Sequence, residues 1–135
     1  MKKYVYSTAK QVVVCGDIHG AFETLVYKSC VQYSMADTVI IVAGDCGFGF
    51  EKPNYYTTLY NRLAGRLRKA NNWVVFVRGN HDDPSYFNEE KLSYERFRCV
   101  PDYSVINNNI APKTTSLAFD MILGGCECSL SIVEC

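Results

Sequence analysis

Three apolar runs stand out along the first 80 residues. Residues 11–17 (QVVVCGD), 37–45 (DTVIIVAGD) and 72–80 (NWVVFVRGN) are nearly continuous in apolar side chains, and each ends in glycine followed by Asp or Asn. Continuous apolar runs, as opposed to alternating ones, are typical of strands that are covered on both faces. The three runs therefore predict three buried β-strands that all end in the same kind of polar turn.

Two segments between these strands have the spacing of amphipathic helices. Residues 21–33 repeat apolar side chains at intervals of three and four, and residues 55–70 do the same at Tyr56, Leu59, Leu63 and Leu67. Basic residues gather in the last turn of the second segment, where they suit the helix dipole. The order strand, helix, strand, helix, strand predicts an α/β fold with a mainly parallel sheet flanked by helices.

The pattern is less regular after residue 84. We expect residues 86–98 to be helical and residues 107–116 to form a loop, whereas residues 116–125 fit either a strand pair or the start of a second sheet. No internal repeat or linker divides the chain. Residues 1–125 are accordingly assigned to one domain, and residues 126–135 to an atypical C-terminal tail.

Composition and charge exclude several classes of protein. The chain has 135 residues, the size of one domain, with 48% hydrophobic residues and 14 basic residues balanced by 14 acidic ones. This balance gives no basic patch for nucleic acid, and no run approaches the roughly 18 apolar residues of a membrane span. Most of the seven cysteines stand singly, as in proteins of a reducing compartment, so we expect a cytoplasmic protein.

The polar ends of the three predicted strands carry good metal ligands. Asp17 and His19 lie two positions apart, so in extended backbone both point to one side. Asp45 ends the second strand with a carboxylate that can bridge two ions, and Asn80 ends the third with an amide oxygen. His81 points elsewhere and is better placed to touch a substrate. Because ligands of such sheets bind beyond the carboxyl ends of the strands, these side chains predict a metal centre there.

The three turn sequences resemble a known family. GDIHG, GDCG and GNHD, each after an apolar strand and in this order, resemble the first three motifs of the calcineurin-like metallophosphoesterases over roughly residues 11–83. The resemblance implies that Asp17 and His19 bind a first metal ion, that Asp45 bridges two ions and that Asn80 binds the second. A mixed nitrogen and oxygen set suits Mn, Fe or Zn.

The same resemblance implies the reaction. The expected function is metal-dependent hydrolysis of a phosphate ester, with one or two divalent ions that activate a water and clamp the phosphoryl group of a phosphorylated substrate. We place His81 in the catalytic set, contacting the phosphate or assisting the leaving group, together with Asp82 and Arg78 as supporting residues. The implied architecture is the N-terminal half of an αββα sandwich.

Two departures from the family pattern leave a second function open. The second motif reads GDCGFGF without the Asp-Arg pair of many members, and no histidine follows His81, although the family completes its site with later histidines. We therefore expect a chain that is truncated or that changes reading frame near Cys126, with the second sheet missing. The alternative to the enzyme is a non-catalytic remnant with weak or no metal binding that acts through a partner. An uncovered sheet edge would favour a homodimer.

Local alternatives exist for each motif. Asp17 could cap a helix with His19 in a turn, Asp45 could cap the following turn, and Asn80 with His81 could be ordinary turn residues. A thiolate metal site is a further alternative in the tail, but its cysteines lack the spacing of a zinc module: Cys126, Cys128 and Cys135.

Overall fold

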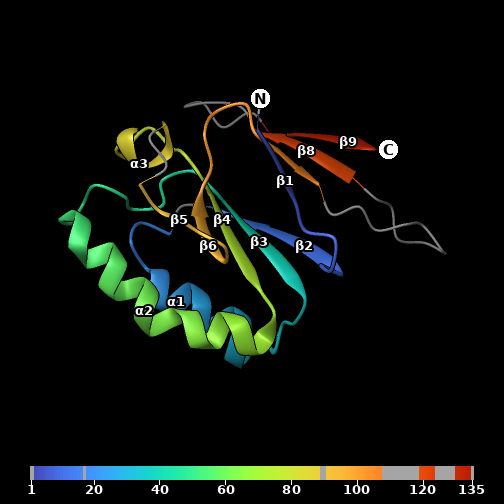
Figure 1. The fold of residues 1–135 in the computed structure, drawn as a ribbon, viewed down its shortest axis with the longest axis horizontal. Helices are drawn as coiled ribbons and strands as arrows, with labels where there is room; N and C mark the ends of the chain where they lie inside the picture. Colours follow the sequence, from blue (N-terminus) through green and yellow to red (C-terminus); the bar gives the residue numbers. More distant parts are fainter. Residues whose placement is uncertain (1, 17, 89–90, 108–118, 124–129, 135) are drawn as a thin grey trace.

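A computed structural model describes residues 2–16, 18–88, 91–107, 119–123 and 130–134. Asp17 and the three tail cysteines lie outside these ranges. Two sheets and the helices of the N-terminal half make up the described part of the molecule (Figure 1). Among the described residues, no helix has the length and apolarity needed to cross a membrane.

The first sheet has five strands in the order β2-β3-β4-β6-β5. Its members are β2 (Gln11–Cys15), β3 (Thr38–Ala43), β4 (Trp73–Val77), β6 (Phe97–Cys99) and β5 (Ser93–Tyr94). The first four run parallel and β5 pairs antiparallel with β6. The three strands predicted from the apolar runs are therefore confirmed, and the sheet is mainly parallel as expected.

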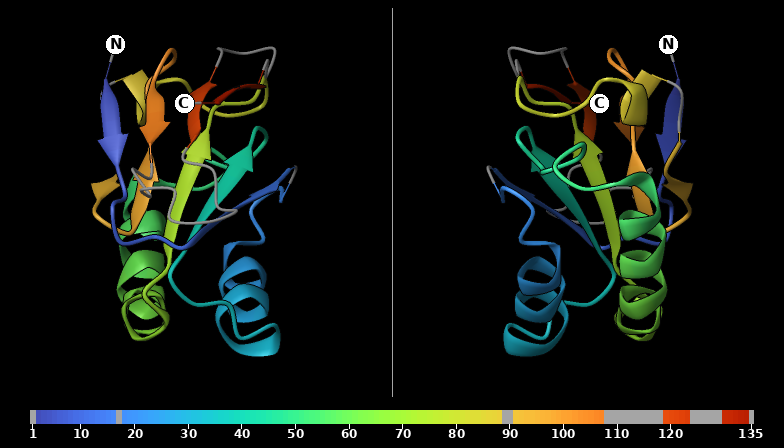
Figure 2. Two further views of the ribbon diagram at one scale, coloured as in Figure 1. Left: turned by 90° about the vertical axis from the view of Figure 1, so that its right-hand side faces the viewer. Right: turned by 90° about the vertical axis from the view of Figure 1, so that its left-hand side faces the viewer.

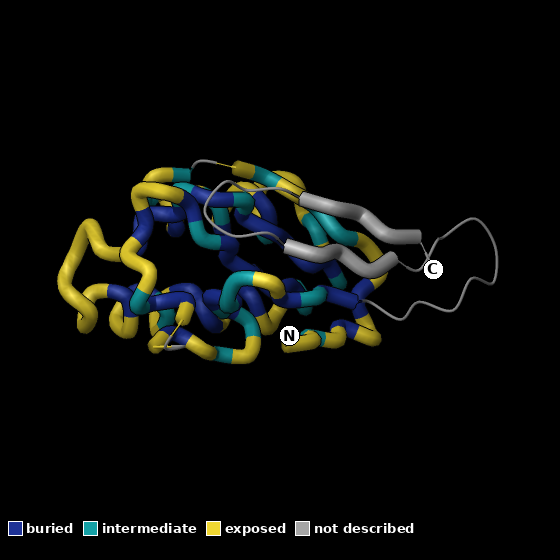
Figure 3. The backbone as a smooth tube through the Cα atoms, turned by 90° about the horizontal axis from the view of Figure 1, so that it is seen from above, coloured by how far each residue is buried: buried dark blue, intermediate teal, exposed yellow. Residues whose placement is uncertain are grey.

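Burial along these strands follows their place in the sheet. Every residue of β4 and all but the last of β3 are buried, whereas β2, at the end of the strand order, has only half-buried and exposed positions (Figure 3). The continuous apolar runs therefore mark central strands correctly for β3 and β4. The β2 edge has no partner strand within the described residues.

Helices cover one face of the five-stranded sheet. Helix α1 (Phe22–Tyr27) continues into a π-helical segment, η1 (Lys28–Gln32), and α2 (Pro53–Ala70) lies beside it (Figures 1 and 2). Proline at the first helical position and left-handed Asn71 after the last define the ends of α2. Its apolar stripe packs with alternate residues of β3 and β4 into a core that includes Phe22, Phe76 and Leu59.

The predicted helix over residues 86–98 is wrong for most of its length. In the described part of this segment only α3 (Ser85–Asn88) is helical, and β5 and β6 follow it. The physical reason lies in β6, where Phe97 and Cys99 enter the helix-side core while the residue between them faces the other way. Period-two burial is the pattern of a strand, and it overrides the helical propensity of the segment.

The expectation that the second sheet is missing is also wrong. A four-stranded sheet in the order β1-β7-β8-β9 comprises β1 (Lys3–Val5), β7 (Val105–Asn107), β8 (Phe119–Leu123) and β9 (Leu130–Glu134). Of the two alternatives for residues 116–125, the start of a second sheet is therefore confirmed by β8. In the described part of the chain the layers are helices, first sheet and second sheet.

A second core fills the space between the two sheets. It joins the other alternate residues of β3 and β4, such as Ile41 and Val75, to Tyr6 after β1 and Ile106 of β7. The two cores place the five-stranded sheet in the middle of the molecule (Figure 2). Its carboxyl edge is therefore held on both faces, which makes it a rigid base for the turns that follow β2, β3 and β4.

Candidate functional site

The turns after β2 and β3 are joined by backbone hydrogen bonds. The His19 N–H donates to the Asp45 carbonyl at 3.0 Å, and the Gly20 N–H donates to the Cys46 carbonyl at 2.8 Å. The Gly44 N–H donates in turn to the carbonyl of Val77, the last residue of β4, at 3.0 Å. The structure thus brings the GDIHG, GDCG and GNHD segments to one edge of the sheet, as parallel strands require.

The carboxylate of Asp82 ties the second and third segments together. Its Oδ1 accepts the N–H groups of Gly47 at 2.8 Å and Phe48 at 3.1 Å, and its Oδ2 accepts those of Gly79 at 2.9 Å and Cys46 at 3.1 Å. The residue is 5% exposed. A buried carboxylate that accepts four backbone donors is fully engaged, so Asp82 acts as a clamp that positions both segments.

Two glycines of the motifs are required by close packing of backbone on backbone. A Cβ atom at position 47 would collide with the nitrogen and Cα of Gly20, and one at position 79 would collide with the nitrogen and the Oδ1 atom of Asp45. Gly47 also has a φ of +113°, which side chains rarely adopt. The glycines that flank the polar residues are therefore what allows the three segments to touch.

The predicted ligand residues lie around this junction. His19 and Asn80 are exposed and Asp45 is half-buried, with its Oδ1 accepting the N–H of His81 at 3.1 Å. His19 and Asp45 both adopt left-handed backbone, with φ of 45° and 46°. Such conformations are uncommon outside glycine and cluster at functional sites. His19, Asp45 and His81 are thus brought together by direct contacts, while Asp17 lies outside the described residues.

The donor set of the described residues can be compared with what a divalent ion needs. Among the described residues, which lack Asp17, no three His, Cys, Asp or Glu side chains form a group that could hold a metal ion. The imidazole of His19, the carboxylate of Asp45 and the amide of Asn80 together supply nitrogen and oxygen donors of the type that Mn, Fe or Zn accept. The chemistry of the donors fits such an ion, and the metal-ligand assignments stay predictions.

Arg78 forms an ion pair with Asp102, and the sequence gives no sign of this pairing. Its guanidinium donates to both carboxylate oxygens of Asp102, at 2.7 and 3.5 Å, and its side chain is largely buried. A two-pronged pair of this kind fixes the plane of the guanidinium. It links the end of β4 to the turn after β6, so the geometry favours a positioning role for Arg78 next to the GNHD segment.

Two aromatic residues support the site, and the sequence analysis did not assign either of them to it. Phe48 is fully buried among the rings of the helix-side core, including Phe22 and Phe76. The hydroxyl of Tyr56 donates to the Gly47 carbonyl at 2.7 Å and accepts the N–H of Gly49 at 3.0 Å. The sequence GDCGFGF holds two aromatic residues, of which Phe48 is buried and Phe50 is 52% exposed, so the motif alone does not tell which one supports the site. Tyr56 looked like an ordinary member of the apolar helix face.

The cysteine in the second motif is not an activated nucleophile. Burial raises the pKa of the Cys46 thiol well above its usual value, and the nearby Asp82 carboxylate acts in the same direction. The thiol donates to the Val77 carbonyl at 3.3 Å. Since the thiolate is the reactive form, Cys46 serves packing at the junction, as expected for the single cysteines.

A family model of calcineurin-like phosphoesterases matches residues 10–125. The chain belongs to this family. The match spans β2 to the end of β8 and includes all three motif segments, so the chain is a metallophosphoesterase by descent and its function is of the phosphoesterase type. No curated protein and no solved structure gives a significant match to this phosphoesterase chain.

Proposed function

We propose that this phosphoesterase hydrolyses a phosphate ester with one or two divalent ions held at the carboxyl ends of β2, β3 and β4. The observation that supports it is the junction of the three motif segments, in which the His19 N–H donates to the Asp45 carbonyl and the His81 N–H donates to the Asp45 carboxylate. Asp17, His19, Asp45 and Asn80 would hold the ions. Bound there, a divalent ion supplies Lewis acidity and favours ionisation of a water molecule.

The residues of the chain itself have separate tasks in this proposal. Asp45 uses one carboxylate oxygen to fix the backbone of His81, so the imidazole of His81 starts from a defined position beside Asn80. Being exposed, that imidazole can contact the phosphate of a bound substrate or give a proton to the leaving oxygen. Asp82 and Arg78 act through other groups and hold the segments in place.

The proposed substrate and metal follow from the chemistry of the site, and the proposed location follows from the cysteines. We propose a phosphorylated substrate, because the expected ions bind phosphoryl oxygens, and we propose Mn, Fe or Zn as the metal. A cytoplasmic location is supported by the free thiols of the four cysteines in the described residues: Cys15, Cys30, Cys46 and Cys99.

A turnover assay with a matched variant tests the proposal. Purified protein is assayed with p-nitrophenyl phosphate in manganese and in excess chelator, alongside Asp45→Asn and the control Asp37→Asn. Asp37 precedes β3, at the opposite end of the sheet from the site. We expect manganese-dependent turnover that is lost in Asp45→Asn and kept in Asp37→Asn. Folded protein with no turnover and no bound metal would support the non-catalytic alternative instead.

A further inference from the structure

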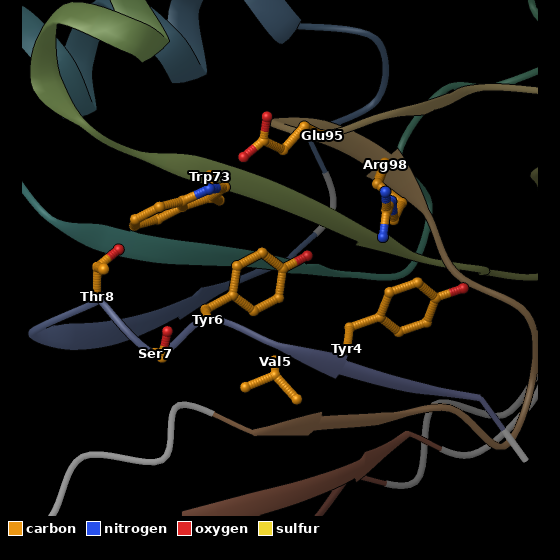
Figure 4. A pocket seen from close by; sticks show the side chains of 8 residues that line it. All are labelled: Tyr4, Val5, Tyr6, Ser7, Thr8, Trp73, Glu95 and Arg98. Atoms are coloured by element: carbon orange, nitrogen blue, oxygen red, sulfur yellow. The ribbon is translucent and has the colours of Figure 1, made fainter.

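A separate pocket opens on the face of the five-stranded sheet that is turned away from the helices (Figure 4). It has a volume of about 230 Å³ and is lined by residues of β1 and the turn after it, by the start of β4 and by the β5–β6 hairpin. In Figure 4, Arg98 lies over Tyr4 with Tyr6 beside them, and Glu95 lies on the same side as Arg98 with its carboxylate turned toward the Trp73 end. Trp73 begins β4 whereas the candidate metal centre follows its end, about 13 Å away along the strand.

Two buried polar atoms in this pocket are without a partner. Tyr6 is 7% exposed, and neither its hydroxyl oxygen nor the Nε of Arg98 has a hydrogen-bond partner among the described residues. In native proteins the large majority of buried side-chain polar atoms have a hydrogen-bond partner, either in the protein or in ordered water. Because Tyr6 Oη and Arg98 Nε both line one small cavity, we expect a group that is not among the described residues to accept their hydrogen bonds.

The strand pattern of β6 explains why an arginine is there. Phe97 and Cys99 enter the helix-side core, so Arg98 points to the space between the sheets, where its guanidinium lies 5.0 Å from the ring centre of Tyr4. A neighbouring arginine provides the contrast. Arg96 donates to the Asn72 carbonyl at 3.2 Å and to the side chain of Asn71 at 3.0 Å, so its donors are used within the fold.

Both orphans act as donors at neutral pH. Burial raises the pKa of Tyr6 to about 12, so its hydroxyl stays protonated, and arginine is always charged. Two donors that face one cavity call for an acceptor with more than one lone pair. The aromatic walls formed by Tyr4 and Trp73 suit an apolar portion of the same molecule.

We propose that this pocket binds a small molecule that carries an oxyanion, either a carboxylate or a phosphate, whose oxygens accept from Arg98 Nε and Tyr6 Oη. The exposed carboxylate of Glu95 stands at the rim, forms no ion pair within the described residues and opposes the approach of an anion. The site is therefore a weak and selective one for small anions. It is distinct from the phosphoesterase centre and does not depend on the proposed reaction.

Calorimetric titration of the full chain in excess chelator tests the proposal, because the chelator removes any anion binding through a metal ion. The probes are benzoate, inorganic phosphate and the neutral analogue benzamide. We expect saturable binding of benzoate, of phosphate or of both, and none of benzamide. Benzoate alone would identify carboxylates as the source of the oxyanion, and phosphate alone would identify phosphates.

Variants locate the binding to the pocket. Tyr6→Phe keeps the buried ring and removes only the hydroxyl, and it should weaken binding about tenfold, as should Arg98→Gln. Arg68→Gln, an exposed change on α2, should leave the affinity unchanged, and Glu95→Gln should increase it several-fold by removing a repulsive charge. No binding of either anion at about 10 mM, ten times a weak millimolar Kd, would overturn the proposal. So would unchanged binding in both Tyr6→Phe and Arg98→Gln.

Discussion

Replacing Asp82 with asparagine tests the clamp that holds the candidate site together. Each oxygen of its carboxylate accepts two backbone N–H groups, so an amide leaves two of these donors facing an NH₂ group whichever way it turns. A buried donor without an acceptor costs about 1–3 kcal/mol. We therefore expect Asp82→Asn to lower the free energy of unfolding by about 2–6 kcal/mol, a large share of the 5–15 kcal/mol typical of a domain.

Urea unfolding in excess chelator measures this loss without any contribution from bound metal. Trp73 is the only tryptophan of the chain and is 5% exposed, so its fluorescence reports global unfolding. Asp83→Asn is the matched control, because this neighbouring carboxylate is exposed and its hydrogen bonds among the described residues come from Ser85 alone, from the N–H at 2.9 Å and from the side chain. Asp83→Asn should change the free energy of unfolding by no more than about 0.5 kcal/mol, as most surface changes do.

The difference between the two variants shows whether the Asp82 carboxylate accepts its four backbone N–H groups in solution. If Asp82→Asn and Asp83→Asn lower the free energy of unfolding by the same amount, within the roughly 0.5 kcal/mol error of such differences, the Asp82 carboxylate faces water in solution. The four-donor clamp would then be refuted, along with the argument that it joins the second and third motif segments.

Three further predictions concern packing, pH and the sheet edge. Gly79→Ala, whose Cβ would strike Asp45, should abolish manganese binding in a calorimetric titration, whereas Gly65→Ala on open helix surface should keep it and raise stability by about 0.5–1 kcal/mol. The pKa of Tyr6 is raised to about 12 in the folded protein, against about 10 in the unfolded chain. The protonated Tyr6 therefore contributes to the free energy of unfolding below pH 10, and this contribution is lost as the pH rises to 12. Urea titrations should show the free energy of unfolding of the wild type, relative to Tyr6→Phe, fall by about 2–3 kcal/mol between pH 10 and pH 12. We also propose that the β2 edge pairs with the β2 edge of a second copy of the chain. Val14 is 41% exposed on β2, so Val14→Lys should convert the dimer to a monomer in analytical ultracentrifugation. A wild type that is monomeric at all concentrations would refute the pairing.

The central strands of the first sheet could be predicted because they are uniform, whereas β5 and β6 at its other end were expected to be helical. In β3 and β4 both faces are buried, so apolar residues run through each strand and a glycine follows within two residues of its end. This signal needs no knowledge of tertiary contacts. Helix α2 was equally clear from its apolar spacing and basic last turn. The convergence of the motif turns then followed from parallel strand order alone.

The second sheet and the supporting residues could not be predicted in this way. The strands β1 and β7 have three residues each, too few for any periodicity, and they pair with one another although most of the chain lies between them. In β6, Arg98 at an inward position hides the strand pattern. The clamp by Asp82 depends on where four backbone N–H groups point, and that direction is set by the fold of the turns.

Crystals grown with manganese and measured at its absorption edge test the central claim most directly. The account predicts an anomalous peak beyond the carboxyl ends of β2, β3 and β4, with the Asp45 carboxylate and the His19 imidazole as ligands. Manganese bound at stoichiometric occupancy elsewhere, with the Asp45 carboxylate and the His19 imidazole turned away from one another, would contradict it.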